Sequence, residues 1–381
     1  MGRSADELES ESVYLDWNAT TPPHPDVLAA MLEAARSAWA NPASPHAAGR
    51  RARAEVESLR EALARALELE PRDVLLTSGG TEANNLALAD APGLVTSRLE
   101  HPSVTRVAER LEAEGRPVRW LPVRAEGRVE ADALCDAASG LPPGSWLATQ
   151  AANHETGVIQ PLAELTAAAH SLGLRVHVDA VQAFGKLPLG ALREADRVAV
   201  AAHKIRGPKG IGALGWRAGA SPRPVLLGGS QERGLRPGTV DPVAAAGFAV
   251  AVELARSGPP RWAALGPRRD RLERALARSG LVNGVAPRLP HVTNLSFPGF
   301  RGDELVAALD LLGVRVASGS ACSAGSAEPS PVILAMLGAE RARSAVRISL
   351  GEDVTDDQLS RAEDAFFRAL APSTRITSRN G

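Results

Sequence analysis

Three features of the sequence place a chemically useful group at the end of an apolar stretch. One strand-like run ends in the carboxylate of Asp179, and another ends in the amine of Lys204. A third run meets Gly80 and Thr81 just before a helical pattern, where free backbone N–H groups favour an anion. Because ligands in open α/β sheets sit at the carboxyl ends of the strands, we expect these features to meet.

Each feature also has a plainer explanation. Thr81 and Asp179 could be helix N-caps, and Lys204 could be a surface lysine that extends its amine into solvent. Together, however, they supply an anion cradle, a carboxylate that keeps a heterocyclic nitrogen protonated, and a buried amine made nucleophilic by desolvation. This combination suits pyridoxal 5′-phosphate and few other cofactors.

The lysines and cysteines are few enough to be considered one by one. The 43 basic residues include three lysines, of which Lys209 lies in a Gly/Pro turn and is expected at the surface. Cys322 lies among small residues, which predicts an exposed loop whose thiolate could accept an atom from a substrate. Cys135 lies in a helical stretch, and we expect it to pack in the core.

The elements that must position these groups alternate between strand and helix. We expect strands at residues 73–76, 93–96, 118–122, 146–150, 175–178 and 197–201, and helices at 26–39, 48–69 and from about Glu82. Strands that are apolar throughout are covered on both faces, so the alternation predicts a mainly parallel sheet.

The pattern changes after about residue 258. There we expect helices at residues 261–278, 303–311 and 356–370 and strands at 291–297 and 346–350. The prediction is a large α/β domain of residues 14–257 and a smaller α+β domain that consists of residues 258–381 together with residues 1–13.

Composition narrows the class of protein. The chain has 381 residues, 44% hydrophobic and 23% charged, which excludes a disordered protein, and its net charge of -1 gives no attraction to nucleic acid or anionic membranes. Two cysteines make no disulfide framework, and residues 1–12 show no secretory signal, so we expect a cytoplasmic protein without a membrane span. No Cys/His spacing resembles a metal site, and we expect structural or surface roles for His24, His46, His170 and His291.

Ordered motifs along nearly the whole chain resemble one family. They occupy residues 14–22, 41–44, 77–85, 100–101, 153–160, 177–186, 203–212, 232–239 and 318–330. The sequence is similar to the NifS/IscS-like cysteine desulfurases, in class V of the fold-type I pyridoxal-phosphate enzymes. The resemblance implies the fold-type I architecture, with a mainly parallel sheet of seven strands and a smaller C-terminal domain.

The resemblance also implies which residues hold the cofactor. Lys204 would bind it covalently, His101 would stack on its ring and assist proton transfer, Asp179 would pair with the ring nitrogen, Gln182 would bond the ring oxygen, and Gly80, Thr81 and His203 would hold the phosphate. Thr239 would reach the phosphate bound to the partner subunit, which implies a homodimer.

Catalysis is implied in the same way. Arg347 would bind the substrate carboxylate, Lys204 would move the Cα proton, and Cys322 would take the sulfur of L-cysteine as a persulfide while L-alanine leaves. The sulfur would pass to an acceptor protein for iron–sulfur cluster assembly, tRNA thiolation or a thio-cofactor. A selenocysteine lyase, another class V lyase or aminotransferase, and a weakly active partner-binding scaffold are the alternatives.

Two positions depart from the family pattern. His154 stands where an asparagine that contacts cofactor and substrate is usual, and Ala201 stands where a phosphate-binding serine is usual. His154 could preserve the contact and add pH sensitivity, or it could impair turnover. The missing hydroxyl at Ala201 would cost about 1.5–3 kcal/mol of phosphate binding if nothing replaces it.

Overall fold

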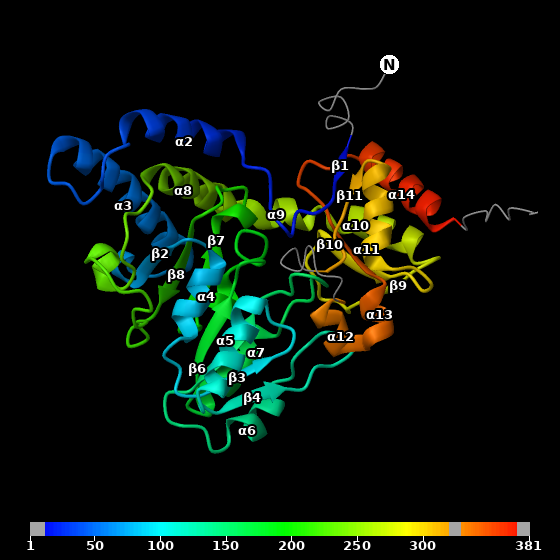
Figure 1. Ribbon diagram of the computed structural model, residues 1–381, viewed down its shortest axis with the longest axis horizontal. Coiled ribbons are helices and arrows are strands. Elements are labelled where there is room, and N and C mark those ends of the chain that lie inside the picture. The colour runs from blue at the N-terminus through cyan, green and yellow to red at the C-terminus, as the bar shows by residue number, and fades with distance from the viewer. Residues whose placement is uncertain (1–11, 320–328, 372–381) are drawn as a thin grey trace, which may run out of the picture.

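The computed structural model describes residues 12–319 and 329–371. A part built on a seven-stranded sheet and a part built on a three-stranded sheet lie side by side, as Figure 1 shows. Cys322 lies outside the described residues. Among the described helices, none has both the length and the apolar composition needed to cross a membrane.

The large sheet confirms the expected α/β architecture. Its strand order is β2-β8-β7-β6-β5-β3-β4, with β8 antiparallel to both its neighbours and the other pairings parallel. The strands are β2 (Val74–Thr77), β3 (Leu94–Ser97), β4 (Val118–Leu121), β5 (Trp146–Gln150), β6 (Arg175–Asp179), β7 (Arg197–Ala201) and β8 (Gly212–Trp216). All six expected strands are present within one residue at either end.

β8 was not predicted, because its two glycines weaken a strand pattern. Close packing against the backbone requires Gly212, and Gly215 lies close to a leucine side chain. A Cβ atom on Gly212 would lie 2.7 Å from the Cα atom of Gly79, and one on Gly215 would lie 2.5 Å from Leu69. β8 therefore packs directly beneath the turn that precedes Gly80.

Helices cover both faces of this sheet. They are α2 (Pro25–Ser37), α3 (Ala47–Leu67), α4 (Gly80–Leu88), α5 (Pro102–Ala113), α6 (Ala133–Ala138), α7 (Leu162–Ser171) and α8 (Pro242–Arg256). Val198 and Val200 of β7 pack in the cluster that includes α3 and α8, whereas Ala199 packs with α4 and α5. Adjacent residues thus point to opposite faces, as expected for a strand buried on both sides.

The smaller part has its own core. An antiparallel sheet is formed by β9 (Leu281–Val282), β10 (Val292–Ser296) and β12 (Ala345–Ser349). Its helices are α9 (Gly258–Ala263), α10 (Gly266–Leu276), α11 (Gly302–Leu311), α12 (Pro331–Leu337), α13 (Ala339–Arg343) and α14 (Asp356–Leu370). The single helix expected at residues 261–278 is wrong. It is two helices, because a proline lies in the first turn of α10 and starts it anew.

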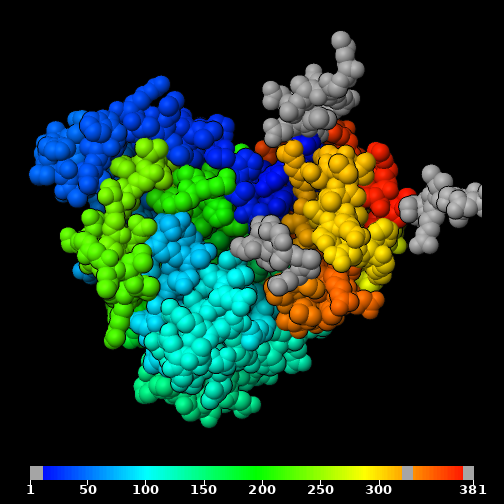
Figure 2. Space-filling view, in the orientation of Figure 1, coloured from blue at the N-terminus to red at the C-terminus, as the bar shows by residue number. Residues whose placement is uncertain are grey.

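The N-terminal segment connects the two parts. β1 (Val13–Tyr14) pairs in parallel with β11 (Val314–Arg315), and Leu15 and Trp17 pack in the core of the smaller part. The chain then passes to the large sheet, and Figure 2 shows this segment (blue) between the green and cyan surface and the yellow and orange surface. Residues just after Trp17 are thereby placed at the junction.

Candidate functional site

A cavity of about 210 Å³ lies at the carboxyl ends of β5, β6 and β7. Nine of the residues implied by the family resemblance line it: Gly80, Thr81, His101, His154, Asp179, Gln182, His203, Lys204 and Arg347. Ala201 lines it as well, together with Asn18 and Asn84, which the sequence did not single out as functional. The expectation that the three opening features meet at one edge of the sheet is confirmed.

The turn between β2 and α4 is shaped to receive an anion. Gly79 is the N-cap of α4 and has φ 153°, a conformation that favours glycine, and no side chain caps the helix. Thr81 is therefore not the N-cap. A Cβ atom on Gly80 would lie 2.6 Å from Val181, so only glycine leaves the cradle open. Uncapped N–H groups at a helix start bind phosphate well.

Asp179, the last residue of β6, is held firmly by hydrogen bonds. Its Oδ2 atom accepts a hydrogen bond from Asn84 at 2.7 Å, and its Oδ1 atom accepts one from the backbone N–H of Val181 at 3.0 Å. The other side of the Asn84 amide contacts His177 at 2.9 Å, and burial lowers the pKa of His177 to about 3. Asp179 thus caps the next turn and also presents a fixed carboxylate to the cavity.

Lys204 follows β7 and meets the N-terminal segment. Its Nζ atom donates hydrogen bonds to the carbonyl oxygens of Asn18 and Ala19, the latter at 2.9 Å. The neighbouring His203 ring lies 3.2 Å from the Thr20 hydroxyl, and burial, followed by the charge of Lys204, lowers the pKa of His203 to about 3. The N-terminal segment therefore sets the position of both side chains.

Two histidine rings that line the cavity lie close together, one edge-on to the other. His101 is the N-cap of α5 and accepts a hydrogen bond from the Ser103 N–H at 3.1 Å. The rings of His101 and His154 are 5.4 Å apart and nearly perpendicular. Burial lowers the pKa of His101, and it lowers that of His154 further, well below its ordinary value. Both rings are therefore neutral near pH 7.

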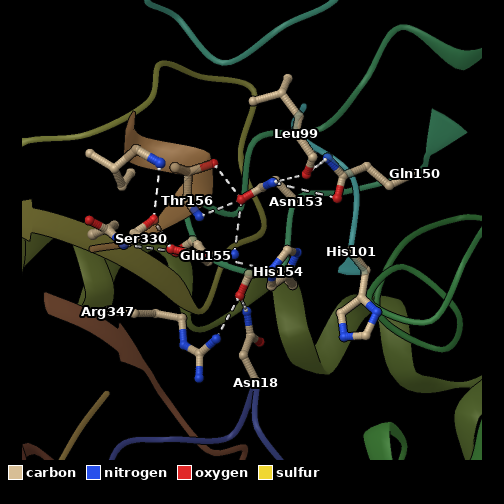
Figure 3. A network of polar contacts seen from close by, with 12 residues as sticks. Asn18, Leu99, His101, Gln150, Asn153, His154, Glu155, Thr156, Ser330 and Arg347 are labelled. Atoms are coloured by element: carbon tan, nitrogen blue, oxygen red, sulfur yellow. Dashed lines mark hydrogen bonds and ion pairs between the residues drawn. The ribbon is translucent and has the colours of Figure 1, made fainter. Parts of the chain in front are cut away.

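His154 has no hydrogen-bond partner for either ring nitrogen among the described residues. Figure 3 shows it beside Glu155, whose Oε1 atom lies 3.6 Å from His154 Nε2 and also lacks a partner there. The other carboxylate oxygen accepts a hydrogen bond from Ser330 at 2.5 Å, and burial raises the pKa of Glu155. His154 lines the cavity, so its two ring nitrogens are available to a ligand.

Arg347, on β12, reaches the same cavity from the smaller part. One guanidinium nitrogen donates to Asp16 at 2.7 Å and another to the His154 backbone carbonyl at 3.0 Å, the latter drawn in Figure 3. Its Nε atom has no partner within the described residues. The contact with Asp16 was not predicted from the sequence.

Other expected positions lie away from the cavity. Thr239 is exposed and does not line it. Cys135 is exposed rather than in the core as expected, because the short helix α6 turns Leu134 inward instead. Lys209 is exposed as expected. Lys186 is fully buried, and no role was predicted for it from the sequence.

The expected structural roles of the remaining histidines are confirmed. His24 and His46 cap α2 and α3 with their side chains, and His170 lies on α7 beside Asp196. His291 is buried and contacts Asn18 at 2.9 Å. Within residues 12–319 and 329–371, no group of three His, Cys, Asp or Glu side chains is arranged to hold a metal ion.

The chain is similar to known proteins over most of its length. Residues 13–361 match the model of the family described as aminotransferase class-V. An IscS-like cysteine desulfurase of Mycobacterium tuberculosis is 38% identical, covering 95% of this chain and 97% of its own. Among solved structures, a NifS-like protein has a TM-score of 0.86 at 31% identity, covering 94% of this chain and 99% of that one.

A further solved structure, titled SspA in complex with cysteine, has a TM-score of 0.76 at 30% identity and covers 88% of this chain and 98% of that one. The cavity lies where the ordered motifs of this group meet in the fold. The chain belongs to the aminotransferase class-V family and, within it, to the IscS/NifS-like cysteine desulfurases.

Proposed function

We propose that this protein is a pyridoxal 5′-phosphate-dependent cysteine desulfurase, which converts L-cysteine to L-alanine and retains the sulfur as a persulfide on Cys322. The observation that carries the proposal is one cavity lined by Asp179, Lys204, the Gly80 turn and Arg347. The names of its relatives support the reaction, and the related structure whose title mentions cysteine supports the substrate.

The residues present fit the cofactor. The Gly80 turn would hold the phosphate, since it offers uncapped N–H groups and a space that a Cβ atom would fill. Asp179 would keep the ring nitrogen protonated, and Lys204 would hold the cofactor covalently. When bound, pyridoxal phosphate supplies an electron sink that acidifies the Cα proton of an amino acid.

The remaining cofactor contacts follow from the family resemblance. His101 would lie against the ring, Gln182 would bond the ring oxygen, and Thr81 and His203 would complete the phosphate site. His154 would contact both cofactor and substrate. Thr239 is exposed, which suits a contact with the partner subunit's cofactor and thus a homodimer.

The chain's own residues then carry the reaction. Arg347 would bind the substrate carboxylate, and Lys204 would remove the Cα proton and later return one. The thiolate of Cys322 would attack the substrate sulfur, so that an S–S bond forms and the C–S bond breaks. The released carbon takes up a proton and leaves as alanine, while the persulfide waits for an acceptor.

We also propose the wider setting. The acceptor would be a protein of iron–sulfur cluster assembly, tRNA thiolation or thio-cofactor synthesis, and the enzyme would work in the cytoplasm. Residues 14–257 would form the cofactor-binding domain, and residues 258–381 with 1–13 would form the domain that carries Cys322.

Alanine release from L-cysteine with a reductant tests the proposal. We expect activity in the unchanged protein, its loss in Cys322→Ala with the cofactor absorbance intact, and its retention in Cys135→Ala. Cys135 is the matched control, since it is the other cysteine of the chain and is exposed. Equal activity in Cys322→Ala would contradict the persulfide step. No activity in any variant despite bound cofactor would favour another substrate.

A further inference from the structure

Lys186 has a buried side-chain amine next to the cavity, and the proposed mechanism leaves this amine without a role. It is 1% exposed, and within residues 12–319 and 329–371 it forms no ion pair with a carboxylate. Burying an ammonium group without an opposite charge is costly, so its retention requires a compensating interaction. The contacts of Lys186 point to one.

Lys186 fixes the orientation of an amide that faces the cavity. Its Nζ atom donates to the Oε1 atom of Gln182 at 3.1 Å. The Asn18 carbonyl can only accept a hydrogen bond, so Gln182 must turn its NH₂ group toward it and its oxygen toward Lys186, whose Nζ atom has protons to donate whether or not it is charged. That NH₂ group donates to the Asn18 carbonyl at 3.0 Å, on the cavity side.

A second path of contacts leads from Lys186 back to Asn18. The Nζ atom lies 5.4 Å from the centre of the Trp262 ring, close enough for a cation–π interaction. Trp262 lies 4.4 Å from the ring of His291, and His291 contacts the Asn18 side-chain oxygen at 2.9 Å. Contacts therefore form a closed ring through Lys186, Gln182, Asn18, His291 and Trp262, which connects the large part, the N-terminal segment and the smaller part.

This ring of contacts is connected to Lys204 through Asn18. The Asn18 carbonyl that accepts from Gln182 also accepts from the Nζ atom of Lys204. Two lysines therefore act on one carbonyl, one directly and one through the Gln182 amide. A change at Lys186 can therefore reach Lys204 through the Gln182 amide and the Asn18 carbonyl oxygen.

When Lys186 is charged, it acts on other titratable groups that are buried near it. Burial, followed by the charge of Lys204, lowers the pKa of Lys186 to about 7, and Arg347 adds to this while Glu352 opposes it. Lys186 in turn contributes to the lowered pKa values of His203 and His291. A positive charge here favours the neutral form of a nearby amine and the ionised form of a nearby oxygen.

We propose that Lys186 is a positioning residue for the cofactor: it holds the Gln182 amide with its NH₂ group toward the cavity. The inference rests on the proposed function, because it concerns the side of the site where Gln182 would bond the cofactor's ring oxygen. Lys186 touches neither substrate nor cofactor in this account.

The test compares Lys186→Met with Lys209→Met, the matched control at an exposed lysine. Methionine keeps the length of the side chain and removes the charge, so the variant is expected to fold at least as stably as the unchanged protein. Equilibrium titration of the cofactor-free proteins with pyridoxal 5′-phosphate measures Kd. We expect Kd to rise about tenfold in Lys186→Met and to stay unchanged in Lys209→Met.

A double variant separates positioning from a general loss of packing. Gln182→Leu alone is expected to weaken cofactor binding by a similar factor, and Lys186→Met combined with Gln182→Leu should be within about twofold of Gln182→Leu. The pH midpoint of the bound cofactor's absorbance change should rise by about 0.5–1 unit in Lys186→Met, since a nearby positive charge is lost.

The outcomes are distinct. Unchanged Kd and pH midpoint in Lys186→Met, or effects that multiply in the double variant, would overturn the inference. If the unchanged protein binds no pyridoxal phosphate, the proposed function itself fails.

Discussion

The two walls of the cavity differ in how their polar groups are satisfied. On the β6 wall, both oxygens of Asp179 accept hydrogen bonds, and the Asn84 amide bonds Asp179, Ser103 and His177. On the opposite wall, both nitrogens of His154 and the Nε atom of Arg347 lack partners among the described residues. A buried polar atom without a partner costs about 1–3 kcal/mol, so the second wall is suited to groups that arrive with a ligand.

The contrast indicates that the two walls bind different ligands. The paired wall fixes a carboxylate in place before anything binds, which suits a resident cofactor. On the unpaired wall Arg347 already bonds Asp16 and the His154 carbonyl, but its Nε atom and both His154 ring nitrogens gain hydrogen bonds only when a ligand fills the cavity, which suits a substrate that comes and goes. Substitutions on either wall can test this distinction one residue at a time.

The largest effect is expected on the unpaired wall at Arg347. Arg347→Ala removes the cation proposed to bind the substrate carboxylate, and losing one partner of a buried charge pair costs several kcal/mol. We expect the KM for L-cysteine to rise about 100-fold. Steady-state alanine release measures it, with the exposed Arg343→Ala as control. A fall in kcat with KM unchanged would remove Arg347 from substrate binding.

On the paired wall, Asn84→Ala should affect the cofactor rather than the substrate. Asp179 would lose its 2.7 Å hydrogen bond and its fixed orientation. We expect cofactor affinity to fall about tenfold, equivalent to about 1.4 kcal/mol, with KM for L-cysteine little changed once the cofactor is saturating. Equilibrium titration with pyridoxal phosphate tests this. A raised KM for L-cysteine at saturating cofactor would contradict the assignment of cofactor binding to one wall and substrate binding to the other.

The paired wall should also make stability depend on pH through His177. Its folded pKa of about 3 is below the ordinary value of 6.5, so the unfolded chain binds more protons between these values. Stability therefore falls as pH falls below about 6.5. Between pH 7 and 5, His177 should account for a loss of about 2 kcal/mol.

Denaturant unfolding at both pH values compares the unchanged protein with His177→Asn, which should lose less stability on acidification. His170→Asn, at a more exposed ring on α7, is the control. Equal pH dependence in the unchanged protein and His177→Asn would contradict the burial of a neutral ring at this position.

The smallest effect is expected for His154→Asn. Burial keeps the pKa of His154 well below its ordinary value, so the substitution exchanges one neutral polar group for another. We expect kcat/KM for L-cysteine to change by less than about tenfold between pH 6 and 9. A many-fold increase would show that the histidine impairs turnover at a position where asparagine serves better.

The sequence predicted the parts of the site that have a local signal. Asp179 and Lys204 were visible because each ends an apolar strand, and Gly80 was visible because small residues separate a strand from a helix. Conversely, β8 was not predicted, because Gly212 and Gly215, which pack closely against their neighbours, interrupt its strand pattern.

Contacts between distant residues had no such signal. Asn18 and Gln182 are 164 positions apart, and Asn84 and Asp179 are 95 apart, yet each pair is joined by a hydrogen bond. Nothing in the neighbourhood of Asn18 or Asn84 indicates which residue it will meet. The same holds for Lys186, whose role depends on contacts that only the folded chain creates.

The most direct test of the account is to find which lysine carries the cofactor. The protein would be loaded with pyridoxal 5′-phosphate, reduced with borohydride, digested and analysed by mass spectrometry. With three lysines in the chain, the answer is unambiguous. The account predicts the modification on Lys204. A modification on Lys186 or Lys209 instead, or none on any lysine, would contradict the assignment of this cavity as the cofactor site.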